Sequence, residues 1–154
     1  MRRFALGALC CAVLIAGCSD DPATTDPVGT IPTVHVRRVN VSLFSEQGLG
    51  VDAGTYWSNS VTIPADAKYA SIAIDFEVIA GKDVEVYVLD DVAFGNWKAD
   101  IAVQAFYSSG RVAAGRKTVT LSPGTYVVVV SNRFSVVTRK AVRVNATATY
   151  EVPL

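Results

Sequence analysis

The stretch ASIAIDFEVIAGKDVEVYVLD, residues 70–90, alternates apolar and polar side chains along almost its whole length. The apolar side chains on one face of its first part are those of Ala70, Ile72, Ile74, Phe76 and Val78. The alternation resumes after Ala80-Gly81 with Val84, Val86 and Val88. A period of two residues is typical of a half-buried β-strand. The pattern therefore predicts two strands, which the Ala80-Gly81 turn would join as a hairpin.

Valine dominates the chain on both sides of this stretch. From Cys18 onward there are 24 Val and only 5 Leu, and valine packs well on a pleated sheet but is stiff in a helix. No window shows an apolar stripe at helical spacing. Further strands are predicted near residues 34–44, 56–63, 101–108, 116–121, 125–131 and 140–150.

Two details refine this prediction. The nearly continuous apolar run from Tyr126 to Val130 is expected to be a strand covered on both faces. Ser122-Pro123-Gly124 has the composition of a tight turn. About eight strands at this spacing predict an all-β fold, a single antiparallel β-sandwich that is jelly-roll-like, over residues 34–154.

The C-terminal half carries an ordered set of short motifs. They are DVEVYVLD (83–90), YSSGR (107–111), VTLSPGTYVVVVSNRFS (119–135) and KAVRV (140–144). Their order resembles the GOLD domain, the β-sandwich of the p24-type cargo receptors. The matching residues are Gly124, Thr125, Tyr126, Ser131, Asn132, Phe134, Ser135, Lys140 and Val142. The family's cysteine is replaced at or near Val129 and its disulfide partner is absent, so the resemblance implies the fold and a binding role, not cargo sorting.

The first seventeen residues have the composition of a secretory signal peptide. Arg2 and Arg3 precede an uncharged apolar run over residues 4–17. As a helix this run would be about 21 Å long, which is short of the ~30 Å hydrocarbon core of a bilayer. The length and the basic flank favour a cleaved signal over a membrane-spanning helix.

The apolar run ends in Ile15-Ala16-Gly17-Cys18, which resembles the bacterial lipobox. The resemblance implies that the thiol of Cys18 receives a diacylglycerol, that the chain is cut before it, and that its new amino group is acylated, for example with palmitate. Two or three acyl chains give a stable anchorage that one chain does not. The covalent lipid on Cys18 is the only cofactor expected, and a membrane is the first expected partner.

The chain is thus predicted to have three parts: a signal peptide over residues 1–17, the lipidated cysteine with a disordered linker over 18–33, and the domain over 34–154. Residues 19–33 hold three Pro, four Thr and three Asp, which is typical of an extended linker. Ser19 follows the cysteine, and by resemblance to Gram-negative sorting rules this favours the outer membrane. All three cysteines lie at or before position 18, so a disulfide or a cysteine-ligated metal in the domain is excluded.

Few residues offer catalytic chemistry. His35 is the only histidine and lies beside the linker, and no cysteine nucleophile remains after Cys18. The carboxylates that could supply oxygen ligands to calcium are those of Asp83, Glu85, Asp90 and Asp91. Alternating acids are also what an exposed strand face carries. The sequence therefore predicts a protein that is not an enzyme and has no metal site.

Three residues are candidates for contact with a partner. Trp97 lies in a predicted loop, where a large aromatic either closes the end of the sandwich or meets a ligand. Arg111 and Arg133 belong to residues 111–143, which hold seven bases and no acid, whereas residues 66–100 hold eight acids and three bases. These segments either pair across strands or form a dipolar surface for charged partners.

The leading hypothesis is a non-enzymatic lipid-anchored protein of the cell envelope whose sandwich has a binding or assembly role, with an envelope protein or a glycan as its possible partner. A carbohydrate-binding module is the alternative, with a glycan stacked on a platform of aromatic side chains: Trp57, Trp97, Tyr56, Tyr69, Tyr87 and Tyr107. Nucleic acid is not an expected partner, because the chain from Cys18 onward has twelve basic and fourteen acidic residues.

Overall fold

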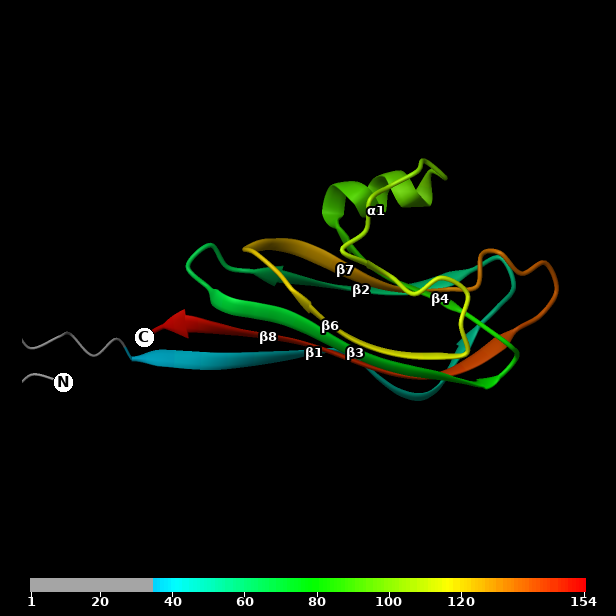
Figure 1. Cartoon of the computed structure of the whole chain (residues 1–154), viewed down its shortest axis with the longest axis horizontal. Coiled ribbons are helices and arrows are strands. Elements are labelled where there is room, and N and C mark those ends of the chain that lie inside the picture. The colour runs from blue at the N-terminus through cyan, green and yellow to red at the C-terminus, as the bar shows by residue number, and fades with distance from the viewer. Residues whose placement is uncertain (1–34) are drawn as a thin grey trace, which may run out of the picture. The chain divides into compact units, whose positions relative to one another are not determined.

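The computed structural model describes residues 35–154, which form a β-sandwich (Figure 1). The predicted signal peptide, Cys18 and the linker lie outside the described residues. The elements are β1 (Val36–Val51), β2 (Tyr56–Ile63), β3 (Lys68–Ala80), β4 (Glu85–Asp90), α1 (Asp91–Lys98), β5 (Tyr107–Ser108), β6 (Ala114–Thr120), β7 (Gly124–Ser131) and β8 (Lys140–Pro153). The all-β prediction with about eight strands is confirmed.

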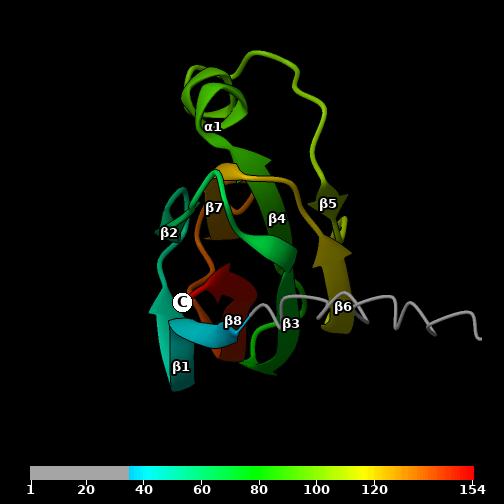
Figure 2. The ribbon, with the colours of Figure 1, turned by 90° about the vertical axis from the view of Figure 1, so that its left-hand side faces the viewer.

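The strands form two antiparallel sheets of four strands each. Sheet A has the order β1-β8-β3-β6 and sheet B the order β2-β7-β4-β5. Every connection except that between β4 and β5 passes from one sheet to the other, and Figure 2 shows the resulting two layers. This interleaved order is that of a jelly roll, as predicted.

The hairpin predicted within residues 70–90 is wrong. β3 pairs with β6 and β8 in sheet A, whereas β4 pairs with β5 and β7 in sheet B. Gly81, with φ at +101°, lies where the chain leaves one layer for the other. The buried faces of β3 and β4 therefore meet across the core instead of lying side by side. Ser122-Pro123-Gly124 likewise connects two layers, from β6 to β7.

The short helix α1 was not predicted, and the loop expected over residues 94–98 is wrong. Asp90 caps the helix, because its Oδ1 accepts a hydrogen bond of 2.7 Å from the backbone N–H of Ala93. Asp91 in the first turn and Lys98 in the last suit the helix dipole. The strand predicted near 101–108 shrinks to Tyr107–Ser108, because the chain first has to return from the helix to the edge of β4.

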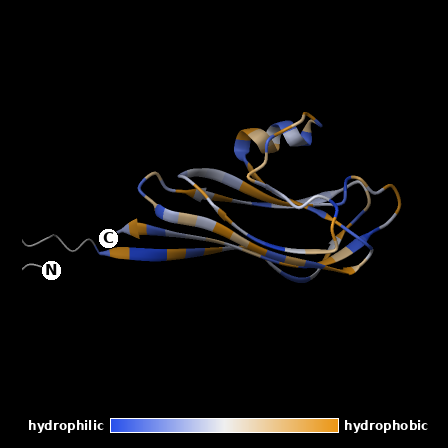
Figure 3. Ribbon diagram, viewed as in Figure 1, coloured by the Kyte–Doolittle hydropathy of each residue, from blue (hydrophilic) through white to orange (hydrophobic). Residues whose placement is uncertain are grey.

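The core lies between the two sheets. Apolar and polar residues alternate along the strands of sheet A (Figure 3), and the apolar ones point inward. The fully buried side chains include those of Ile72, Ile74, Phe76, Val84, Val86, Val88, Val128, Val130, Val142 and Val144. The alternation in residues 70–90 therefore predicted the buried faces correctly, although not the pairing.

Strand β7 is covered on both faces, as predicted. Val128 and Val130 belong to the main core, whereas Val127 and Val129 form a second buried cluster on the outer side of sheet B. Helix α1 lies over that side (Figures 1 and 2).

Side chains of β2 close one edge of sheet A. The indole Nε1 of Trp57 donates a hydrogen bond of 2.8 Å to the carbonyl of Gly50, and the amide of Asn59 donates one of 2.5 Å to the carbonyl of Leu43. Both acceptors belong to the edge strand β1. Unpaired backbone groups on an edge strand invite pairing with another chain, so these two bonds protect part of the edge.

Asn132 ties the β7–β8 connection to the end of β1. It is fully buried, and its Nδ2 donates to the carbonyls of Val51 at 3.1 Å and Thr138 at 2.8 Å. Its backbone N–H donates to the carbonyl of Thr55, and its own carbonyl accepts from Gly54. One side chain thus joins two connections at the same end of the sandwich.

Replacing Asn132 with alanine should therefore destabilise the fold. The change leaves two carbonyls without their donor, which costs about 1–3 kcal/mol of unfolding free energy. Denaturant melts measure the loss. Asn96→Ala, on the exposed surface of α1, is the control and should change stability by less than about 0.5 kcal/mol. Equal unfolding midpoints for the two variants would contradict the role of Asn132.

Candidate binding surface

Helix α1 holds Trp97 against the outer side of sheet B. The indole meets the ring of Tyr56 edge-on, with 5.0 Å between centroids, and lies 5.7 Å from the ring of Tyr87. These rings pack on the cluster that contains Val127 and Val129. Trp97 therefore covers a face of the sandwich and not its end.

Arg133 fastens the same helix. Its guanidinium carbon lies 4.7 Å from the centroid of the Trp97 ring, its Nη1 donates to the Trp97 carbonyl at 2.9 Å, and its Nη2 donates to Asp100 Oδ1 at 2.6 Å. The last carbonyls of a helix lack partners within the helix and attract cations. The side chain of Arg133 is only 26% exposed. Arg133 and Trp97 therefore contribute to the packing of α1 on sheet B. Contact with a partner stays a prediction for both residues.

Arg111 lies over the aromatic ring of Phe134, the residue that follows Arg133. Its guanidinium carbon is 4.3 Å from the centroid of Phe134, and its Nε is 3.4 Å from Glu85 Oε1. The Nζ of Lys140, a side chain only 5% exposed, is 5.6 Å from the same ring and 3.2 Å from Asp83 Oδ1. Phe134 thus contacts two cations, and each cation has its own carboxylate.

The acidic and basic segments pair with each other across strands. Five ion pairs join residues 66–100 to residues 111–143: Arg111–Glu85, Arg116–Asp75, Arg133–Asp100, Lys140–Asp83 and Arg143–Glu77. Cross-strand pairing, the first of the two interpretations, is confirmed for Arg116–Asp75 and Arg143–Glu77, which join neighbouring strands, and the other three pairs involve residues of the connections. The second interpretation, a dipolar surface for charged partners, stays a prediction, although ion pairs engage most of its basic residues.

Three of the four carboxylates that were considered for calcium are engaged in structural contacts. Asp83 and Glu85 hold cations, and Asp90 caps α1. Over residues 35–154, no three His, Cys, Asp or Glu side chains gather into a group that could hold a metal ion. Nor does this part of the chain contain a helix of the length and hydropathy needed to cross a membrane.

Two half-buried tyrosines have raised pKa values. Burial raises the pKa of Tyr87 above its ordinary 10.0, and its hydrogen bond of 3.0 Å to Glu85 acts in the same direction. Burial also raises the pKa of Tyr107. The Tyr87 hydroxyl is thus engaged in a hydrogen bond within the domain.

The outer side of sheet A differs from that of sheet B, because no described helix lies over it (Figure 2). The strand register lines up its outward side chains in three rows. The first row is Asn40, Thr149, Ser71 and Thr120; the second is Ser42, Thr147, Ala73 and Thr118; the third is Ser45, Asn145, Asp75 and Arg116. We call these twelve residues the polar face.

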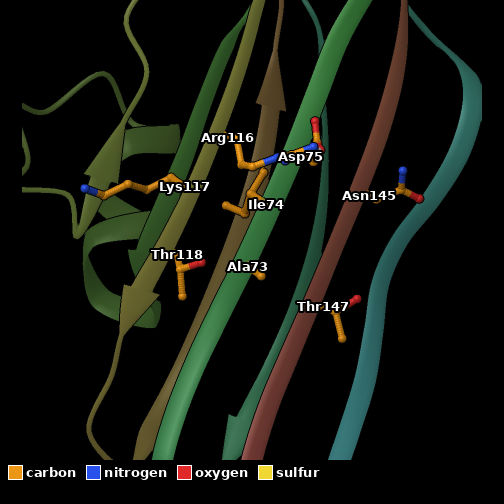
Figure 4. A pocket seen from close by; sticks show the side chains of 8 residues that line it. All are labelled: Ala73, Ile74, Asp75, Arg116, Lys117, Thr118, Asn145 and Thr147. Atoms are coloured by element: carbon orange, nitrogen blue, oxygen red, sulfur yellow. Dashed lines mark hydrogen bonds and ion pairs between the residues drawn. The ribbon is translucent and has the colours of Figure 1, made fainter.

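A hollow of about 270 Å³ lies across the second and third rows (Figure 4). In this view Arg116 of β6 reaches towards Asp75 of β3, while Asn145 and Thr147 project from β8. The Nε of Arg116 donates to Asp75 Oδ2 at 2.8 Å. Two further hollows share this ion pair and extend to Glu77. The polar face is therefore shallow, polar and open to solvent.

Another hollow, of about 440 Å³, lies on the side of α1 and is lined by Asp90, Gln104, Ala105 and Phe106. Its one charged residue, Asp90, is the helix cap, so it brings together no further titratable groups.

The sequence did not single out the polar face. Its signal was the Thr-x-Thr alternation at Thr118 and Thr120 and again at Thr147 and Thr149. That signal becomes a surface only once β3 is known to lie between β6 and β8.

No protein-family model matches the chain, and no curated protein matches it significantly. The resemblances to the lipobox and to the GOLD domain thus stay predictions from short motifs.

Removing the Arg133 side chain should loosen α1. Arg133→Ala loses a hydrogen bond to a helix-terminal carbonyl, an ion pair and a cation–π contact, and should lower the unfolding free energy by about 2 kcal/mol. Arg116→Ala is the control: that side chain is 82% exposed, and its ion pair should contribute less than about 1 kcal/mol. A larger loss in the control, measured by denaturant melts, would refute the structural role of Arg133.

Proposed function

We propose that the protein is a non-enzymatic lipoprotein of the cell envelope, anchored through lipid on Cys18, with a sandwich that binds a partner. The lipobox-like residues 15–18 and the apolar run before them support the anchor. Ser19 supports the outer membrane in a Gram-negative host.

The difference between the two outer sides of the sandwich carries the binding role. Helix α1 and its aromatic residues cover sheet B, whereas the polar face of sheet A stays open and contains the hollow beside Asp75 and Arg116. A sheet face that needs no cover for stability is available for contact. The polar face is therefore the proposed binding surface.

Most of the residues whose side chains could serve catalysis or metal binding are engaged in structural contacts. Asp83 and Glu85 hold cations, and Asp90 caps α1. His35 is exposed just before β1. These observations support a binding protein over an enzyme.

The alternative, a glycan stacked on several aromatics, finds little support. Trp97 of α1 packs against Tyr56 of β2 and Tyr87 of β4. Trp57 is 52% exposed and Tyr69 is 81% exposed, but they lie on β2 and β3, in different sheets. The exposed aromatics therefore make no shared platform.

The anchor can be tested at one sulfur atom. Cys18→Ser should abolish lipidation and release the protein from membranes, because serine cannot form the thioether. Mass spectrometry of the mature N-terminus and membrane fractionation measure both effects. Cys10→Ser and Cys11→Ser are matched controls that should stay lipidated, since both residues lie in the discarded segment. An unmodified Cys18 in the wild-type protein would disprove the anchor.

The binding surface can be tested in cells. A photo-reactive residue at position 118, on the polar face, should form cross-linked adducts. The same residue at position 62, exposed on the outer side of sheet B, is the control and should form few. Gel mobility and mass spectrometry of the purified protein report the adducts. Adducts at position 62 alone, or at neither position, would refute the polar face as the binding surface.

A further inference from the structure

We propose that the ligand of the polar face is an uncharged glycan chain, bound mainly by hydrogen bonds. This inference rests on the proposed function, which makes the polar face the binding surface. It differs from the platform of several aromatics considered above, because the contacts are mainly hydroxyl and amide groups, with one aromatic ring, that of Tyr69, at the end of the face.

The polar face has unused hydrogen-bonding capacity. Within residues 35–154, the first two rows contain one hydrogen bond between side chains, from Thr149 Oγ1 to Asn40 Oδ1 at 2.9 Å. The hydroxyls of Ser71, Thr118 and Thr147 have no protein partner in that part of the chain. Each hydroxyl can donate one hydrogen bond and accept two. A ligand rich in hydroxyl groups can satisfy them in place of water.

The charges within the three rows balance, and Lys117 beside the hollow is the one cation there without an ion-pair partner among the described residues. Asp75 pairs with Arg116, and just beyond the third row Glu77 pairs with Arg143. A polyanion such as nucleic acid needs an excess of unpaired cations to bind, and the face offers no such excess. Nε and Nη2 of Arg116 both donate to Asp75 Oδ2, which leaves Asp75 Oδ1 as an acceptor beside Arg116 Nη1 as a donor. Neighbouring hydroxyls on one sugar ring offer groups in matching pairs.

The polar face also lacks what a protein partner would need. The centre of a protein–protein interface is enriched in aromatic residues and depleted of serine. Ala73 is the one apolar residue among the twelve side chains of the three rows. If this face were buried against an apolar surface, its hydroxyls would lose their hydrogen bonds to water, and each unpaired hydroxyl would cost free energy. A polyhydroxylated ligand avoids that cost.

The shape of the face suits an extended chain. Four neighbouring strands at ~4.8 Å spacing make it about 14 Å wide. At the end of β3 nearest the first row lies Tyr69, which is 81% exposed and has a φ of +53°. A large aromatic rarely adopts that backbone conformation. Its ring is available to pack on the apolar side of a sugar at one end of the chain.

The test is a titration of the mature lipidated protein with a panel of uncharged oligosaccharides built from hexoses and N-acetylhexosamines. Calorimetry is done in a detergent whose headgroup contains no sugar. We expect one class of oligosaccharide to bind. Thr118→Val and Thr147→Val keep the side-chain shape but remove the hydroxyl. Each should weaken binding about tenfold, which corresponds to about 1.4 kcal/mol.

The matched control is Thr62→Val. The Oγ1 of Thr62 lies 3.1 Å from that of Thr125 on the outer side of sheet B, so this variant loses the same group on the other side of the sandwich. It should bind like the wild type. All three variants should keep the wild-type unfolding midpoint within a few degrees, because valine suits an exposed strand position.

Several results would overturn the inference. They are an absence of binding across the panel, an equal loss in Thr62→Val, and stronger binding of anionic glycans with a steep dependence on salt. If position 118 formed cross-links only to proteins, the inference of a glycan ligand would be wrong, but the proposed function would remain. An absence of cross-links together with an unlipidated Cys18 would remove the proposed function itself.

Discussion

The rest of the structure depends on the requirement that the valines of β7 be buried on both faces. Residues 127–130 are four consecutive valines in one strand, so two of them point away from the core. Leaving Val127 and Val129 in water would forfeit about 1.5–3 kcal/mol each. The chain meets this requirement by placing α1 between β4 and β5, with Trp97 over sheet B and Arg133 fastening the helix. Because α1 covers the outer side of sheet B, no described helix lies over the outer side of sheet A.

Much of the fold could be predicted because alternation records which face of a strand is buried. The buried faces of β3 and β4 were predicted in this way, whereas the cover of β7 on both faces was predicted from its nearly continuous apolar run. Alternation does not record which strand lies alongside, so residues 70–90 were taken for a hairpin although they connect two layers. Helix α1 was missed because its eight residues include Gly95 and show no apolar stripe. Its cap at Asp90 was the available signal.

The candidate site was harder to predict because the aromatic and charged residues that stand out in the sequence contact one another within the domain. Trp97, Arg111 and Arg133 stand out in the sequence, yet each is in contact with a partner from a distant segment. The opposite is true of Thr118 and Thr147, which are unremarkable alone. They become neighbours of Ala73 only through the register of three strands. Surfaces built from small polar residues are invisible until the pairing is known.

The pairing of the first strand with the last has a kinetic consequence. β8 lies between β1 and β3, and Val36 is opposite Pro153. Sheet A therefore cannot assemble until nearly the whole domain has been synthesised. Contacts between such distant segments delay closure, and sandwiches of this kind fold in milliseconds to seconds. A chain that emerges one end first therefore completes sheet A only when its last strand arrives, because β8 holds β1 and β3 together.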